Sequence, residues 1–182
     1  RCYAVAIAGE SDAANSSYAA NLATWQADIE AKVRASSMVR DTVRLFVTQQ
    51  GACTLGAHSS MTTCVSPIQM YNAARTGSGK VILVGPRHQY TYVPAMAHPT
   101  NTHSRRHGCK IGEALAVGAS WQPLWPVVSS PVSRNGAVIT LSLYTPTQPL
   151  VYDDTTVTGI SATTRGFEYT DDSSPPAISG VD

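Results

Sequence analysis

The strongest constraint on the fold of this chain is a regular alternation of short, largely apolar runs with longer stretches that carry helix signals. The apolar runs span residues 3–8, 43–48 and 80–84, and their length suits strands buried on both faces of a sheet. The stretches with helix signals span residues 18–33, 66–75 and 101–118. A strand–helix order that repeats three times predicts an α/β fold of three layers, with helices on both faces of a parallel sheet.

The first predicted helix has an apolar stripe with spacings of three and four residues, formed by Tyr18, Leu22, Trp25, Ile29 and Val33. Its charged residues fall largely off this stripe: Asp28, Glu30, Lys32 and Arg34. We therefore expect the stripe to face the sheet and the charged residues to face solvent.

The composition changes after Trp121, and we divide the chain there. Residues 1–120 form the predicted α/β domain, residues 121–135 an extended linker, and residues 136–182 a small antiparallel β-sandwich module. In this module Ile139, Leu141 and Leu143 alternate with polar or smaller residues, which predicts one buried apolar face. Both ends of the sequence suggest a piece of a larger polypeptide, and the module looks incomplete.

Charge and hydropathy argue against two classes of partner. The formal net charge is +1 and only 14% of residues are charged, so no basic surface for nucleic acid is expected. The pair Arg105 and Arg106 is the only basic cluster. No apolar stretch approaches the roughly 18 residues of a membrane span. We expect neither nucleic acid nor a membrane as a partner.

The cysteine and histidine spacings do not predict a metal site, and no cofactor is expected. Cys53 and Cys64 could close a loop as a disulfide, while a zinc site with His58 matches none of the usual ligand spacings. The disulfide state of the four cysteines, Cys2, Cys53, Cys64 and Cys109, stays open. His103 and His107 are four residues apart on one helix, but no third ligand stands at a matching distance, so we expect both in solvent.

Two polar motifs follow predicted strands. Gly9, Glu10, Ser11 and Asp12 come after the first strand, and His98 stands just before the third helix. Open α/β sheets bind their ligands at the carboxyl ends of the strands, so we expect His98 within a few ångströms of residues 9–12. The residues predicted to line the same cleft are Arg87, His88 and Tyr90, which follow the third strand.

These motifs resemble the SGNH hydrolase superfamily. The segment Gly-Glu-Ser-Asp-Ala at residues 9–13 is similar to the third conserved block, and His-Pro-Thr-Asn at residues 98–101 is similar to the fifth. Within the superfamily the pattern is most similar to sialate-O-acetylesterase-like carbohydrate esterases, which occur in bacteria and on bacteriophage tail proteins. The resemblance implies a flavodoxin-like sheet, an O-acetylated glycan as substrate, and an extracellular or virion-associated location.

The resemblance also implies roles for the motif residues. A serine attacks the ester carbonyl, and His98 is the general base that takes its proton. Gly9 lies near the oxyanion site, while Glu10, Ser11 and Asp12 brace the surrounding loops. An alternative, in which Ser11 is a nucleophile at a strand–helix elbow, requires a helix directly after Ser11, whereas the helical stripe begins near Tyr18.

The sequence departs from the family pattern at three places. The block with the nucleophilic serine is absent, Ala95 stands where an aspartate three residues before the histidine is expected, and Ala8 replaces an amide side chain. Two hypotheses follow. In the first, the chain is part of a carbohydrate O-acetyl esterase, inactive alone, whose nucleophile comes from an N-terminal segment or another chain. In the second, it is a non-catalytic virion or surface protein, structural or glycan-binding and possible as a homo-oligomer, that retains the scaffold.

Overall fold

The structure is a computed structural model, and it divides the chain into two compact units, Arg1–Leu150 and Val151–Asp182. The residues that it describes are 2–7, 12–38, 41–51, 65–76, 78–87, 89–93, 98–123, 125–126 and 132–145. Of the predicted site residues, Gly9, Glu10, Ser11 and His88 lie outside the described residues. The same holds for most of the predicted β-sandwich module, so its boundaries and those of the linker stay predictions.

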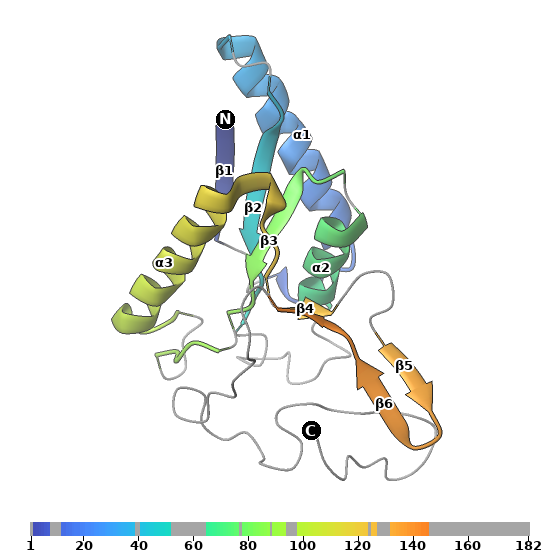
Figure 1. The fold of residues 1–182 in the computed structure, drawn as a ribbon. Coiled ribbons are helices and arrows are strands. Elements are labelled where there is room, and N and C mark those ends of the chain that lie inside the picture. The colour runs from blue at the N-terminus through green and yellow to red at the C-terminus, as the bar shows by residue number, and fades with distance from the viewer. Residues whose placement is uncertain are drawn as a thin grey trace. The chain divides into compact units, whose positions relative to one another are not determined.

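A parallel sheet of three strands forms the centre of the first unit (Figure 1). Its strands, in spatial order, are β1 (Cys2–Ala6), β2 (Val43–Thr48) and β3 (Val81–Gly85). The helices are α1 (Tyr18–Ser36) between β1 and β2, α2 (Ser66–Thr76) between β2 and β3, and α3 (Asn101–Val117) after β3. The short 3₁₀ helix η2 (Gly118–Ser120) extends α3. The predicted alternation and the parallel sheet are confirmed.

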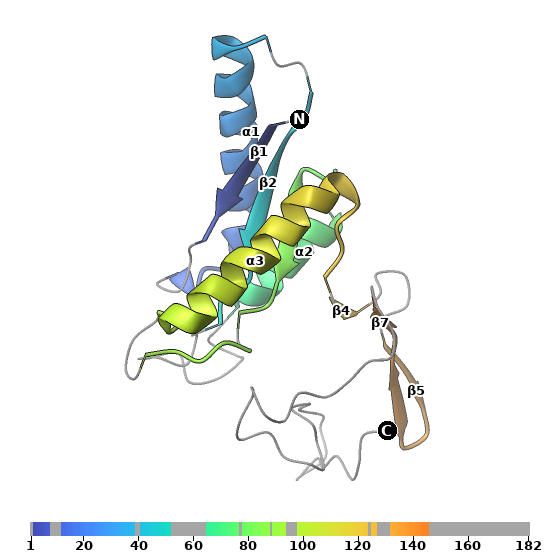
Figure 2. The same ribbon diagram turned by 60° about the vertical axis from the view of Figure 1, so that its left-hand side comes forward.

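The helices pack on both faces of the sheet. Successive side chains of β2 point to opposite faces, so neighbouring residues of this strand contact different helices. Leu45 and Val47 belong to one core cluster with residues of α1 and α2. Phe46 belongs to a second cluster with Ile111 and Ala114 of α3. Figure 2 shows α3 crossing the face of the sheet opposite α1. None of the described helices is both long and apolar enough to cross a membrane.

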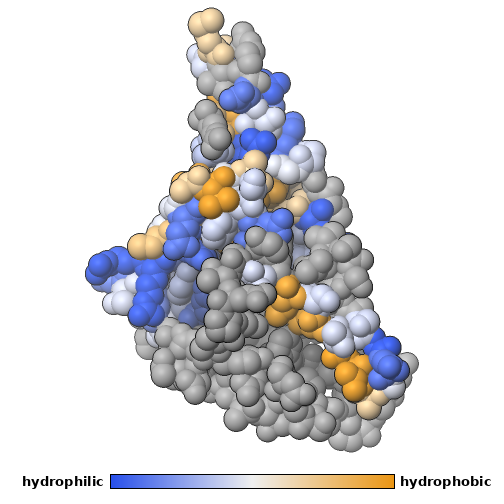
Figure 3. All heavy atoms as spheres, in the orientation of Figure 1, coloured by the Kyte–Doolittle hydropathy of each residue, from blue (hydrophilic) through white to orange (hydrophobic). Residues whose placement is uncertain are grey.

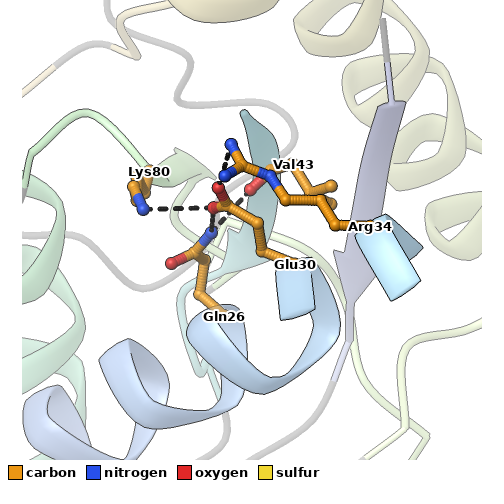
Figure 4. A network of polar contacts seen from close by, with 5 residues as sticks. All are labelled: Gln26, Glu30, Arg34, Val43 and Lys80. Carbon is orange, nitrogen blue, oxygen red and sulfur yellow. Dashed lines mark hydrogen bonds and ion pairs between the residues drawn. The ribbon is translucent and has the colours of Figure 1, made fainter. Parts of the chain in front are cut away.

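The prediction for the buried face of α1 is wrong at two positions. Trp25 is 46% exposed, whereas Glu30, which was expected in solvent, is 6% exposed, and Gln26 is buried beside it. The cause is a polar network at the amino ends of β2 and β3 that compensates the buried carboxylate (Figure 4).

Gln26 and Glu30 form the centre of this network. The Gln26 amide donates to Oε2 of Glu30 and to the main-chain carbonyl of Val43, each at 2.7 Å. Glu30 Oε1 lies 2.6 Å from Nη2 of Arg34, and its Oε2 lies 3.1 Å from Nζ of Lys80. These contacts, the hydrogen bond from Gln26 first, lower the pKa of Glu30 despite its burial. The network connects α1 to both strands.

Short antiparallel pairs follow the parallel sheet. β5 (Val132–Asn135) and β6 (Val138–Leu141) form a hairpin, and β4 (Trp125–Pro126) pairs with β7 (Leu143–Tyr144). Gly136 has a φ of +59°, as the first position of a two-residue hairpin loop of type I′ or II′ requires. The expected burial of one apolar face is wrong at Ile139, which is 43% exposed, because a two-stranded hairpin leaves one face uncovered unless another layer packs on it.

Replacing Glu30 by Gln should lower the free energy of unfolding by about 1–2 kcal/mol at pH 7, because it removes charge-assisted contacts to Lys80 and Arg34. Since the folded pKa of Glu30 is lowered, its contribution is present at neutral pH and is lost as the pH falls below 4.5 through the lowered value. Urea unfolding across this pH range measures both effects. The matched control is Asp28→Asn on the exposed side of α1, which should change stability by less than about 0.5 kcal/mol. Equal effects of the two variants would contradict the network's role.

Candidate functional site

Buried polar side chains concentrate at the carboxyl edge of the parallel sheet. Outside the network of Gln26 and Glu30, the buried polar residues of the described part belong to segments at or near this edge: Thr48, Gln50, Ser66, Arg87 and His107. The main-chain N–H of Gln49 donates to the carbonyl of Gly85 at 3.1 Å, which joins the ends of β2 and β3. Burying a polar side chain costs free energy, so a group of such side chains at one edge needs an explanation. In open α/β sheets ligands bind at this edge, and we therefore look for the functional site there.

The segment that follows β1 is attached to the start of α2. The hydroxyl of Ser66 donates to the carbonyl of Asp12, and the N–H of Ser66 donates to the carbonyl of Ala13 at 2.9 Å. The Asp12 carbonyl also accepts the N–H of Asn15 at 2.9 Å. Asp12 is exposed, and these bracing contacts run through its main chain instead of the carboxylate.

His98 lies on a loop that connects β3 to α3 and folds back on itself. The N–H of Val93 donates to the carbonyl of His98, and the N–H of Thr100 donates to the carbonyl of Thr91, both at 2.9 Å. Tyr92 and Pro99 form an antiparallel bridge between these bonds. His98 itself is exposed. The loop therefore presents the imidazole on a main-chain frame; Ala95 lies outside the described residues.

Arg87 begins this loop and is 5% exposed. Its carbonyl accepts the N–H of Tyr90 at 3.0 Å and the hydroxyl of Tyr92 at 3.4 Å. Tyr90 is half-buried, and its ring lies 5.4 Å from the ring of His107 and 6.0 Å from that of His103. Arg87 and Tyr90, two of the residues predicted to line a cleft with His98, thus share the loop that carries it.

The expectation that His103 and His107 face solvent is wrong. His107 is 6% exposed, and burial, followed by the charge of Arg87, lowers its pKa from 6.5 to about 4. His103 is half-buried, and its Nδ1 lies 3.1 Å from the main-chain nitrogen of Thr91 and 3.2 Å from Oγ1 of Thr100. The spacing of four residues places both rings on the side of α3 that meets the loop. No cluster of three metal-ligating side chains occurs among the described residues.

The outer side of α3 is hydrophilic. In Figure 3 hydrophilic side chains gather over the N-terminal part of this helix, where Arg105 and Arg106 are exposed. Further along, Lys110 pairs with Glu113 at 2.9 Å and lies 5.1 Å from the centre of the Trp121 ring. The ammonium group of Lys110 therefore contacts Glu113 and Trp121.

Two hollows of the surface lie at the amino ends of the strands, away from His98. One is lined by Gln26, Lys80 and small side chains, the other by residues that include Tyr3 and Arg44. Neither hollow contains a residue of the predicted site.

Searches with the whole chain against protein-family models, curated proteins and solved structures found no match.

Acidification should destabilise the protein through His107. Its folded pKa of about 4 is below the unfolded value of 6.5, so the unfolded chain binds a proton in this range while the folded protein does not. Stability is full well above pH 6.5 and falls, by about 3 kcal/mol, as the pH approaches 4. In His107→Gln this part of the pH dependence should disappear from urea titrations. His98→Gln, at an exposed histidine, is the matched control and should keep the wild-type slope; an unchanged slope in His107→Gln would contradict the assignment.

Proposed function

We propose that the chain is part of a serine-type esterase that removes O-acetyl groups from carbohydrate, with His98 as its general base. The observation that carries the proposal is the placement of His98: an exposed imidazole on a hydrogen-bonded loop between the carboxyl end of β3 and the start of α3. In open α/β sheets this edge is where substrates bind. The motif resemblance supplies the substrate class, and the family itself remains part of the proposal.

In this proposal the main catalytic contribution of the chain is a correctly positioned imidazole. A serine hydroxyl attacks the acetyl carbonyl while the imidazole takes its proton, and the protonated imidazole then gives this proton to the leaving sugar oxygen. Water hydrolyses the acetyl-enzyme by the same route. Histidine suits this role because its charge changes near neutral pH.

The main-chain frame of the loop supports the orientation of His98. The carbonyl of His98 is held by Val93, and the flanking Thr100 is held by Thr91. In a triad an acidic side chain orients the imidazole, and its loss can reduce kcat by about 10⁴. Because Ala95 stands at the expected acidic position, the imidazole is oriented either by the main-chain hydrogen bonds of the loop or by a carboxylate elsewhere.

The nucleophile belongs, in this proposal, to an N-terminal segment or a separate chain with a Gly-x-Ser-Asn-like turn after a strand. Glu10, Ser11 and Asp12 then form one wall of the site and Arg87, His88 and Tyr90 another. The residues 9–12 provide the oxyanion side through Gly9. An extracellular or virion-associated setting fits a glycan substrate.

A non-catalytic, glycan-binding or structural role is the second candidate. One observation favours it: Ala95 stands in place of the acid. In this case the same edge of the sheet would bind glycan without turnover, and substitution of His98 would change affinity instead of rate.

The test compares residues 1–182 with a longer form that includes an upstream serine block. The short chain should not hydrolyse p-nitrophenyl acetate efficiently, and the longer form should deacetylate an O-acetylated glycan. His98→Ala should lower kcat of the longer form at least about 100-fold with an unchanged melting temperature, since general-base catalysis contributes 10²–10⁴. Arg105→Ala, at an exposed position on α3, is the control and should retain activity.

Full activity of His98→Ala would place the base elsewhere. Efficient turnover by residues 1–182 that is lost in Ser11→Ala would establish the elbow alternative. Glycan binding without turnover in the longer form would favour the non-catalytic role.

A further inference from the structure

His103 links the loop that carries His98 to helix α3. The main-chain N–H of Thr91 donates to Nδ1 of His103 at 3.1 Å, and Oγ1 of Thr100 lies 3.2 Å from the same nitrogen. Thr91 and Thr100 are themselves paired by a main-chain hydrogen bond of 2.9 Å. Nδ1 of His103 thus contacts both ends of the loop, Thr91 and Thr100, close to where the loop joins α3.

These contacts define the protonation state that the link requires. A main-chain N–H can only donate, so Nδ1 must be an acceptor and the proton of the neutral imidazole lies on Nε2. The Thr100 hydroxyl can donate to Nδ1 as well. In the doubly protonated imidazole both nitrogens are donors, and Nδ1 would face the N–H of Thr91 donor to donor.

We propose that His103 is a positioning residue: as a neutral acceptor it fixes the base of the Thr91–Thr100 loop on α3 and thereby the direction in which His98 is presented. The link holds the segment on both sides of His98, whose carbonyl bonds Val93. The consequence for catalysis rests on the proposed function, whereas the link itself does not.

The groups around His103 come from its own helix and from the loop. On α3, Nη1 of Arg106 lies 3.3 Å from Nε2, and His107 is one turn further along. From the loop, the ring of Tyr90 lies 6.0 Å from that of His103 and 5.4 Å from that of His107, and the charge of Arg87 lowers the pKa of His107. A guanidinium can only donate, and in the tautomer that the link requires Nε2 also carries a proton, so the contact with Arg106 is not a hydrogen bond in this state and Arg106 does not replace the acceptor function of His103.

Amide hydrogen exchange of Thr91 in residues 1–182 tests the link, with two variants that differ in one property. His103→Leu removes the acceptor, and the exchange rate of Thr91 at pH 7.5 should rise about fivefold. His103→Asn keeps an acceptor oxygen near the position of Nδ1 and cannot be protonated, so exchange should stay within about twofold of wild type. Arg105→Ala serves as the control on the exposed side of α3.

Rescue by the acceptor-keeping variant separates this role from a merely structural one. A structural role would give His103→Leu and His103→Asn the same loss of Thr91 protection, whereas an acceptor role predicts that only His103→Leu loses it. If His103→Leu does not fold, His103→Ala removes the same acceptor and takes its place in the comparison. Unchanged Thr91 exchange in His103→Leu, or equal loss of protection in His103→Leu and His103→Asn, would overturn the proposal.

The catalytic consequence is measured on the longer form. His103→Leu should lower kcat about five- to tenfold with little change in KM, and His103→Asn should restore kcat. An intact link with no effect of His98→Ala on activity would reject the proposed function and leave the link in place. Loss of activity in His98→Ala with no change of Thr91 exchange in His103→Leu would reject the link alone.

Discussion

The arrangement depends on β2 lying between two parallel neighbours with both of its faces buried. Five of its six residues are buried, and Phe46 packs toward α3 while Leu45 and Val47 pack toward α1 and α2. Because β1 and β3 run parallel to β2, all three strands end at one edge, and each helix must return across a face before the next strand. This single constraint brings the segment after β1 and the loop after β3 to the same edge of the sheet.

The strands and helices could be predicted because the apolar runs of a buried parallel strand are local features of the sequence. The buried face of α1 could not, since Glu30 is stabilised by Lys80, which lies fifty positions further along the chain and has no local signature. The exposure of Ile139 could not be predicted either. Alternation predicts that one face of a strand is apolar, but burial of that face requires a second layer, which alternation does not specify.

The candidate site divides in the same way. The position of His98 between a strand and a helix could be predicted, because the order of elements is written in the sequence. The roles of His103 and His107 could not, because their burial comes from the loop at Tyr90 and Thr91 folding against α3. A histidine pair at helical spacing predicts a shared face but not what that face meets. His98, the predicted general base, is exposed. His103 and His107, which were expected in solvent, contact the loop that carries His98.

In the proposed function His98 and residues 9–12 form one site at the carboxyl edge of the sheet. An experimental structure of residues 1–182 in which both segments are ordered measures this directly, as the separation of the His98 imidazole from the main chain of residues 9–12. We expect a few ångströms, close enough for both to contact one acyl group. Side chains that point to opposite faces of the sheet, too far apart to share a ligand, would contradict the claim.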